Sequence, residues 1–199
     1  MDFRFTGIKD LDLLTLSYLK DEDLLNMCLV NKYVNNLCKD ENFWRNRTQN
    51  KFKYASEVKN PDKSWRNYYL QLISISSKNN IEELSSELIA ASKRGDLDIV
   101  KYLLSIKKFP WRALNQSLGY AAAFGKLDIV KVLHEKGANI QDTDDFALKW
   151  AASNGHLDTV KYLVENHANI SAENNFALKA ATKNGHFKIT KYLVNILEA

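Results

Sequence analysis

The stretch "LDIVKYLL" at residues 97–104 recurs three times at an interval of thirty residues, as "LDIVKVLH" (127–134), "LDTVKYLV" (157–164) and "FKITKYLV" (187–194). A glycine stands two positions before each copy, at Gly95, Gly125, Gly155 and Gly185. In the first copy Leu97, Val100 and Leu104 have the spacing of one face of a helix. The copies therefore predict four amphipathic helices, one in each unit of a repeat.

A second helix is predicted before each glycine. The aligned segments share a leucine and, three residues later, an alanine: "ELIAASKRG" (87–95), "SLGYAAAFG" (117–125), "ALKWAASNG" (147–155) and "ALKAATKNG" (177–185). Small residues on one face let a neighbouring helix approach to about 8 Å, and glycine ends a helix because it enters the left-handed region without strain. Each unit is therefore predicted to be a helical hairpin, and the hairpins are expected to stack because one hairpin cannot bury its apolar face alone.

The segments between the units are predicted to be loops. Residues 135–145 and 165–175 are polar and favour extended loops or short hairpins. Pro110 excludes a continuous helix through residues 106–116, so we expect an irregular loop there.

The composition is typical of a globular intracellular protein. The 199 residues are 45% hydrophobic and 26% charged, and the net charge of +4 is too mild to predict a nucleic-acid surface. No apolar run approaches the roughly 18–20 residues of a membrane span, and the charged N-terminus does not fit a signal peptide. Cys28 and Cys38 lack the spacing of a zinc site, so we predict reduced, half-buried packing residues in a reducing compartment.

Catalysis, metals and cofactors are not expected. The sequence has no P-loop, no Gly-x-Gly-x-x-Gly motif and no recognisable arrangement of a nucleophile with a base. His156 and His186 lie one repeat apart, about 10 Å by helix packing, which is too far for one zinc ion, so we interpret them as turn-stabilising. Tyr120 and Trp150 share a repeat position, where packing between adjacent first helices is favoured over stacking on a ligand. Four lysines indicate a solvated face rather than a site for an acidic partner: Lys93, Lys183, Lys188 and Lys191.

The repeated units resemble ankyrin repeats. The segment "AASNGHLDTVKYLVENHANI" (151–170) is similar to their usual form, A-A-x-x-G-H-L-x-x-V-x-x-L-L-x-x-G-A, and about four copies fill residues 82–199. The unit has 30 residues instead of about 33, and "FALK" (146–149) replaces the usual Thr-Pro-Leu-His start, so we expect a shortened hairpin without a threonine cap. His167 stands where Gly137 stands one repeat earlier, which predicts a strained C-cap. Short repeats of this kind are most similar to those of giant DNA viruses of amoebae.

The N-terminal third resembles an F-box. In "SYLKDEDLLNMCLVNKYV" (17–34) and the residues after it, the family pattern is matched by Ser17-Tyr18-Leu19, Asp23-Leu24-Leu25, Val30, Tyr33, Leu37 and Phe43-Trp44. The opening Leu-Pro of that family is absent, and "IKDL" stands near its place. Residues 1–50 are interpreted as an F-box-like domain and 51–81 as a connecting helical segment, in which Asn60 caps a helix and Pro61 takes its first position.

Together the two resemblances imply an all-α protein that bridges two partners. The F-box would bind a Skp-type adaptor of a cullin–RING ubiquitin ligase, through Leu13, Leu16, Leu19, Leu24, Leu25, Val30 and Trp44. The repeats would hold an unidentified target protein at the hairpin tips and before each glycine, through Lys93, Arg94, Phe124, Asp142, Asp144, Asp145, Ser153, Asn154, Glu173, Asn174, Lys183 and Asn184. The alternative is an ankyrin scaffold whose N-terminal helices only cap the stack. Either function places the chain in the cytoplasm or nucleus, of a host cell if it is viral, with no membrane or nucleic-acid partner.

Overall fold

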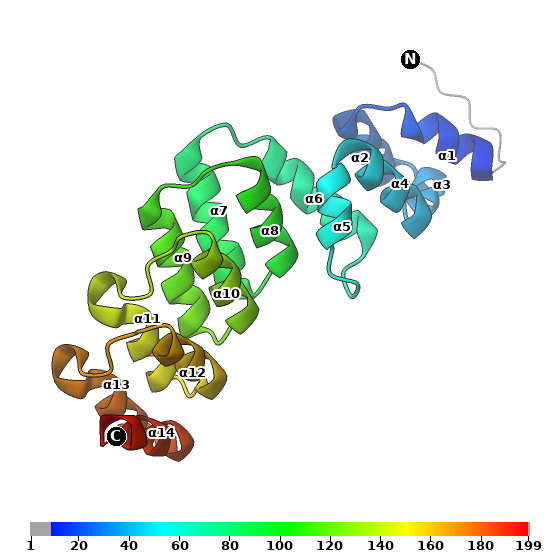
Figure 1. Cartoon of the computed structure of the whole chain (residues 1–199). Helices are drawn as coiled ribbons and strands as arrows, with labels where there is room; N and C mark the ends of the chain where they lie inside the picture. Colours follow the sequence, from blue (N-terminus) through cyan, green and yellow to red (C-terminus); the bar gives the residue numbers. More distant parts are fainter. Residues whose placement is uncertain (1–8, 199) are drawn as a thin grey trace. The chain divides into compact units, whose positions relative to one another are not determined.

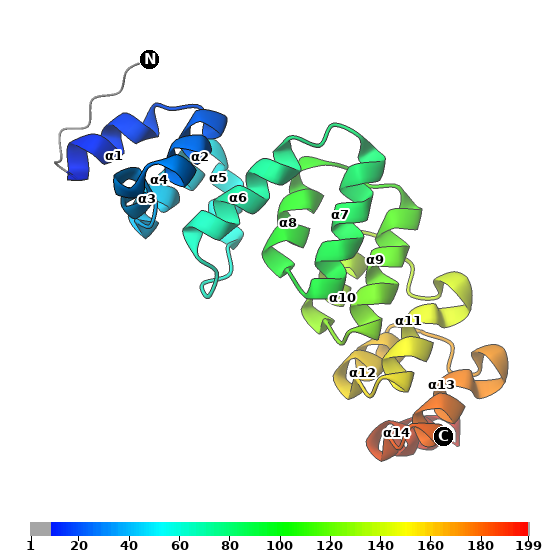
Figure 2. The same ribbon diagram turned by 180° about the vertical axis from the view of Figure 1, so that it is seen from behind.

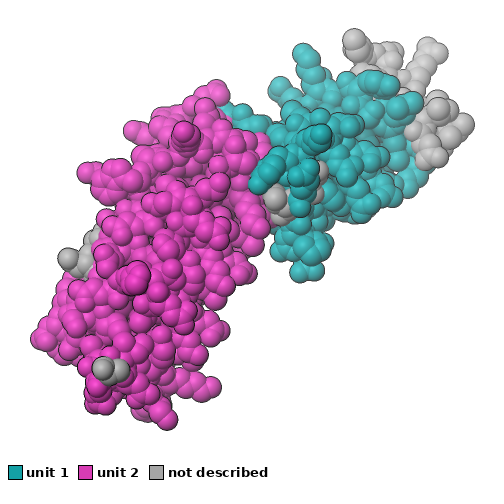
Figure 3. All heavy atoms as spheres, in the orientation of Figure 1, with its two compact units in different colours: residues 1–77 teal, residues 78–199 magenta. Residues whose placement is uncertain are grey.

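The computed structural model describes residues 9–198, and within this range the side chains of Asp10, Leu11, Thr15, Ser56, Val58, Thr143 and Asp144 are also outside the described set. All secondary structure of the described range is helical, which confirms the predicted all-α class. The chain divides into two compact units, Met1–Ser77 and Lys78–Ala199, which Figure 3 colours separately.

The first unit contains six helices within the described residues: α1 (Lys9–Ser17), α2 (Asp21–Val30), α3 (Lys32–Leu37), α4 (Glu41–Lys51), α5 (Lys53–Val58) and α6 (Trp65–Ser76). Trp44 on α4 and Tyr69 on α6 are fully buried, and their rings lie 5.3 Å apart. Since α4 packs against α5 and α6, this unit extends to Ser77 and includes most of the segment that the sequence assigned to a connection.

Side-chain caps set several helix boundaries in the first unit. The Asn31 amide oxygen accepts hydrogen bonds from the backbone N–H groups of Tyr33 and Val34, so α2 and α3 are separate helices. The predicted start of α6 is wrong, because the Ser64 hydroxyl caps that helix by accepting from the N–H of Asn67. The Asn60 side chain instead accepts from the N–H of Asp62 and closes an Asx turn before the helix.

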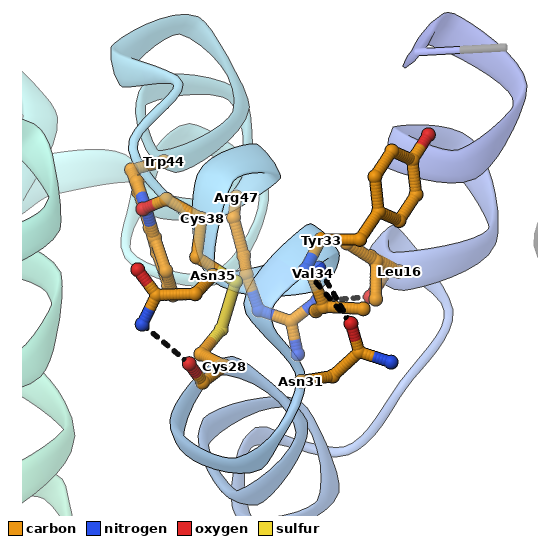
Figure 4. Close-up of a disulfide and its surroundings, with 9 residues drawn as sticks. All are labelled: Leu16, Cys28, Asn31, Tyr33, Val34, Asn35, Cys38, Trp44 and Arg47. Atoms are coloured by element: carbon orange, nitrogen blue, oxygen red, sulfur yellow. Dashed lines mark hydrogen bonds between the residues drawn. A yellow bond between two sulfur atoms is a disulfide. The ribbon is translucent and has the colours of Figure 1, made fainter. Parts of the chain in front are cut away.

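The two cysteines form a disulfide, which makes the prediction of reduced thiols wrong. Cys28 near the end of α2 and Cys38 at the end of α3 have Cα atoms 6.0 Å apart, and both are buried rather than half-buried. Figure 4 shows the bond between the two helices, with the Asn35 amide donating to the carbonyl of Cys28 at 2.7 Å. The tight turn at Asn31 brings the cysteines together, which their spacing in the sequence did not indicate.

The second unit is a stack of helical hairpins. Its helices are α7 (Ile81–Arg94), α8 (Leu97–Ile106), α9 (Trp111–Ala123), α10 (Leu127–Glu135), α11 (Asp142–Ser153), α12 (Leu157–Glu165), α13 (Ala172–Lys183) and α14 (Phe187–Leu197). Each first helix packs against the next, from α7 through α9 and α11 to α13, and the second helices form a parallel layer. Figures 1 and 2 show these two layers from opposite sides. The predicted stack of hairpins is confirmed.

The glycine turns join the helices of each hairpin. Gly95 ends α7 with φ +88°, and the three equivalent glycines also have positive φ. At the other end of each repeat the chain turns without strands. His167 has φ +70°, as the substitution of glycine at this position predicted. Glu173, Asn174 and Asn175 form a left-handed turn at the start of α13, which takes the place of a longer hairpin.

Candidate functional site

A band of aromatic rings crosses the layer of first helices. Tyr120 on α9 meets Phe146 on α11 edge to face, with ring centroids 6.0 Å apart, and Phe146 lies 5.9 Å from Trp150. The predicted packing between adjacent first helices is thus confirmed for Tyr120. Trp150 and Phe176 retain 45% and 42% exposure, so the band also offers apolar surface to a partner.

Charges of opposite sign lie at the two ends of two first helices, α7 and α13. Carboxylates stand in their first turns, at Glu82, Glu83 and Glu173, and cations in their last turns, at Lys93, Arg94 and Lys183. This order suits the helix dipole, which favours acids at the N-terminus and bases at the C-terminus. The ammonium of Lys93 lies 3.8 Å from the centre of the Tyr120 ring, so cation–π contact already occurs on this face.

Several residues predicted to contact a target also hold neighbouring repeats together. The side-chain amide of Asn154 donates to the carbonyl of Ala123 at 2.8 Å, and that of Asn184 donates to the carbonyl of Ser153 at 2.7 Å. A ring nitrogen of His156 approaches the Ala123 carbonyl and one of His186 the Ser153 carbonyl, at 3.1 and 2.9 Å. Each histidine therefore joins its own turn to the end of the preceding first helix, a contact between repeats that the predicted turn-stabilising role did not include. The Asn-Gly-His triplet at 154–156 and 184–186 was the signal in the sequence for this inter-repeat bond.

The predicted tip residues differ in what their side chains contact. Asp145 is buried and accepts a hydrogen bond from the N–H of Asn169 in the next tip at 2.8 Å, so it links two repeats. Glu173 accepts from the ammonium of Lys149 at 2.7 Å, and Asn174 is exposed. The side chain of Asp144 lies outside the described residues.

The remaining predicted contacts lie near the glycine turns. Arg94 forms ion pairs with Glu87 and Asp96 at 3.0 and 2.8 Å. Lys183 is exposed, and Phe124, at the end of α9, keeps 53% of its surface exposed. Phe124 is therefore placed where a partner can reach it.

The residues predicted to bind an adaptor divide into two groups in the first unit. Leu16, Leu19, Leu24 and Trp44 are buried in the core of the unit. Leu13 and Leu25 are partly exposed, and Val30 is 83% exposed. Leu14 and Leu29 are also exposed, although the sequence did not assign them to adaptor binding, and Tyr18 was matched to the family pattern without being assigned to the surface. Amphipathic periodicity alone could not separate the two groups, because these helices are short and crowded with apolar residues.

A polar network fixes the helices beside this surface. The Arg47 guanidinium donates to Asp21 at 2.8 Å and to the carbonyl at the end of α1, on Ser17, at 2.9 Å. Asp21 also bonds to Lys51 and to the hydroxyl of Tyr69. Burial raises the pKa of Asp21, but the hydrogen bonds from Lys51, Tyr69 and Arg47 outweigh it and leave this pKa below its usual value. These residues line an open cleft of about 1150 Å³ between α1 and α4.

The described side chains of residues 9–198 include no group of three or more His, Cys, Asp or Glu that is arranged to hold a metal ion. None of the helices in this range is long and apolar enough to span a membrane.

The register of four hairpins with glycine turns defines a helical repeat protein. A family model described as ankyrin repeats, in three copies, matches residues 67–144 and 118–198. The chain belongs to the ankyrin-repeat family, which implies binding to a protein partner and is typically not enzymatic. A search of the curated proteins found no match.

Proposed function

We propose that the chain recruits a target protein to a ubiquitin ligase. The F-box-like residues 1–50 would bind a Skp-type adaptor of a cullin–RING ligase, and the ankyrin repeats, residues 82–199, would hold the target. The recruited ligase and its conjugating enzyme would perform the chemistry, so this chain contributes only proximity and orientation.

The exposed apolar side chains of the first unit carry this proposal. Leu29 and Val30 end α2 with 76% and 83% exposure, although the unit has a buried core of its own. Large apolar residues that stay exposed beside a complete core mark a surface for another protein. Leu16, Leu24 and Trp44 are buried in the core of the unit and so are removed from the predicted adaptor contacts, none of which the alternative, a scaffold with an N-terminal cap, requires.

Substitution of Val30 tests the adaptor half of the proposal. The purified chain is expected to bind a purified Skp-type adaptor, and Val30→Asp is expected to weaken the dissociation constant at least about tenfold, or ~1.4 kcal/mol, because a charge replaces an apolar contact. Isothermal titration calorimetry measures this change. Leu24 is unsuitable for the test because it is fully buried, and aspartate there would unfold the unit.

Phe187→Asp provides the matched control for Val30→Asp. Phe187 is similarly exposed but lies on α14 in the second unit, so its substitution should leave adaptor affinity unchanged. Failure of the unmodified chain to bind the adaptor would contradict the proposal and favour the scaffold. Equal loss in both variants would contradict the assignment of the surface to α2.

The proposal places the chain in the cytoplasm or nucleus, of a host cell if the chain is viral. The Cys28–Cys38 disulfide is the observation that stands against a reducing compartment, because disulfides are rare there. Both cysteines are buried, and limited access slows exchange with soluble thiols.

On the target side, we expect Phe124→Ala to reduce target capture without unfolding the repeats. Phe124 is half-exposed at the end of α9, so its removal should change the free energy of unfolding by no more than about 0.5 kcal/mol. Quantitative mass spectrometry of proteins captured by the two forms measures the first effect, and thermal unfolding the second. A fall of many degrees in the midpoint would show that Phe124 belongs to the core.

A further inference from the structure

The loop between α8 and α9 differs from the other tips of the stack in sequence and in burial. It reads "KKFP" at residues 107–110, where the next two repeats read "GANI" (137–140) and "HANI" (167–170). The alanine and the isoleucine of both later tips are buried against the stack. In the first tip the two lysines and the proline are exposed. This loop therefore offers side chains to a partner where the other tips are packed within the chain.

Two large apolar side chains flank the loop and stay at the surface. Trp111, the first residue of α9, keeps 59% of its surface exposed, and Ile106, the last residue of α8, keeps 42%. The guanidinium carbon of Arg112 lies 5.3 Å from the centre of the Trp111 ring. This cation–π contact restricts both side chains before binding, which lowers the entropy that binding would cost. Tryptophan and arginine are also the residue types that most often dominate the energetics of protein interfaces.

The positive charges of the loop are not neutralised within the chain. Lys107, Lys108 and Arg112 are exposed, and among the described residues none of the three forms an ion pair with a carboxylate. The first turn of α9 contains no acid, in contrast to the first turns of α7 and α13. Three cations within six residues thus remain available to a ligand of opposite charge.

We propose that residues 106–112, the basic loop, bind an acidic segment of the target protein that has an apolar side chain among its carboxylates. The inference rests on the target-binding half of the proposed function and is independent of the adaptor. The carboxylates would pair with Lys107, Lys108 and Arg112, and the apolar side chain would lie on the Trp111 ring. Charge-assisted hydrogen bonds to a guanidinium are among the strongest in proteins, and complementary charge selects the partner.

The neighbouring helices favour a narrow polypeptide over a flat anionic surface. The first helices begin along one edge of the stack (Figure 1), so the basic loop lies between the starts of α7 and α11. Glu82 and Glu83 on α7 and Glu173 on α13 are exposed near the same edge. A membrane or a nucleic acid that reached the loop would also approach these carboxylates and be repelled by them. A single acidic segment can follow the loop and avoid them.

Titration of the full chain with the peptide acetyl-Glu-Asp-Leu-Asp-Glu-amide tests the proposal. In a ¹H–¹⁵N NMR spectrum, the indole N–H signal of Trp111 is expected to shift and saturate at low ionic strength, with a dissociation constant of about 0.1–1 mM. The indole signal of the buried Trp44 should stay in place. The neutral peptide acetyl-Gln-Asn-Leu-Asn-Gln-amide has the same size without the charge, and its binding should be at least about tenfold weaker.

Variants locate the binding on the loop. Lys107→Gln combined with Lys108→Gln should weaken binding of the acidic peptide about tenfold or more. Lys188→Gln combined with Lys191→Gln removes the same charge from exposed positions on α14 and should leave the affinity unchanged. Trp111→Ala should also weaken binding by about tenfold, measured by isothermal titration calorimetry because the indole signal is lost.

Several outcomes would overturn the proposal. These are absence of a saturable shift, equal affinity for the neutral peptide, and equal loss in the two double lysine variants. Binding to vesicles of phosphatidylcholine and phosphatidylserine in equal parts, lost in the variant of Lys107 and Lys108 and without any peptide binding, would assign the loop to a membrane instead. Failure of adaptor binding would leave this titration unaffected. Target capture that depends on Phe124 but occurs without peptide binding would contradict only the present inference.

Discussion

Replacing Trp44 by alanine should lower the free energy of unfolding of the first unit by about 3–5 kcal/mol, the usual cost of truncating a buried tryptophan. Trp44 is fully buried on α4, and its ring contacts those of Phe43 and Tyr69 at 5.1 and 5.3 Å. Its indole N–H donates to the carbonyl of Cys38 at 2.7 Å, so alanine would also leave a buried acceptor without its partner. Small domains are stable by only about 5–15 kcal/mol, so much of the helical structure of this unit should be lost.

Hydrogen exchange measured by mass spectrometry checks this prediction, because it reports α4 and α6 separately from the repeats. Amides of these two helices should lose protection in Trp44→Ala, while those of α9 and α11 keep it. Trp150→Ala is the matched control, since Trp150 is 45% exposed and its truncation should cost well under half as much. If Trp44→Ala kept full protection but lost adaptor binding, Trp44 would be a contact residue and not part of the core.

The repeats could be predicted from the sequence because each feature occurs four times. The apolar spacing of residues 97–104, the alanines of the preceding helix and the glycine turn recur in the same register. A chance match in one copy would not be repeated in the other three. The strained residue at His167 followed from a single comparison with Gly137. Repetition thus supplied the information that an alignment of relatives would otherwise give.

The first unit has no second copy, and the errors concentrate there. The start of α6 was misplaced because both Asn60 and Ser64 are good capping residues, and only the turn closed by Asn60 decides between them. The disulfide was missed because proximity of Cys28 and Cys38 depends on the bend at Asn31. Local propensity cannot predict the start of α6 or the proximity of the cysteines, because both depend on the tertiary structure.

In the repeats, surface and interior functions of polar residues were difficult to separate. Asn154 and Asn184 precede a glycine and are exposed, as a contact residue would be, yet their amides bind the preceding repeat. Asp145 is an aspartate in a polar tip, where an exposed side chain would be expected, but it is buried and accepts a hydrogen bond from the next tip. Only the position of the neighbouring repeat reveals which polar groups already have partners within the chain.

Gly155→Ala is expected to destabilise the stack by about 2–4 kcal/mol. Gly155 has φ +84°, where an alanine costs about 1–2 kcal/mol. Its new Cβ atom would lie 2.7 Å from Cε1 of His186 and displace the ring, whose Nε2 lies 2.9 Å from the carbonyl of Ser153. Losing that hydrogen bond adds about 1–2 kcal/mol. Denaturation in guanidinium chloride measures the change.

Gly137→Ala separates backbone strain from the clash. Gly137 has φ +91° and no atom within 4 Å of an added Cβ, so alanine there should cost only the strain of about 1–2 kcal/mol. The equivalent position in the next repeat already carries a residue with a side chain, His167. Equal costs for the two glycine substitutions would contradict a structural role for His186.

The double variant Gly155→Ala with His186→Ala completes a cycle that isolates the contact between repeats. His186→Ala alone should cost about 1 kcal/mol, because it removes one hydrogen bond. In the Gly155→Ala background it should cost little or restore stability, since the ring that clashes is gone. Strict additivity of the two costs would mean that the residues do not interact. Because each repeat is stabilised mainly by its neighbours, weakening this contact should also unfold α13 and α14 at a lower denaturant concentration than the rest of the stack.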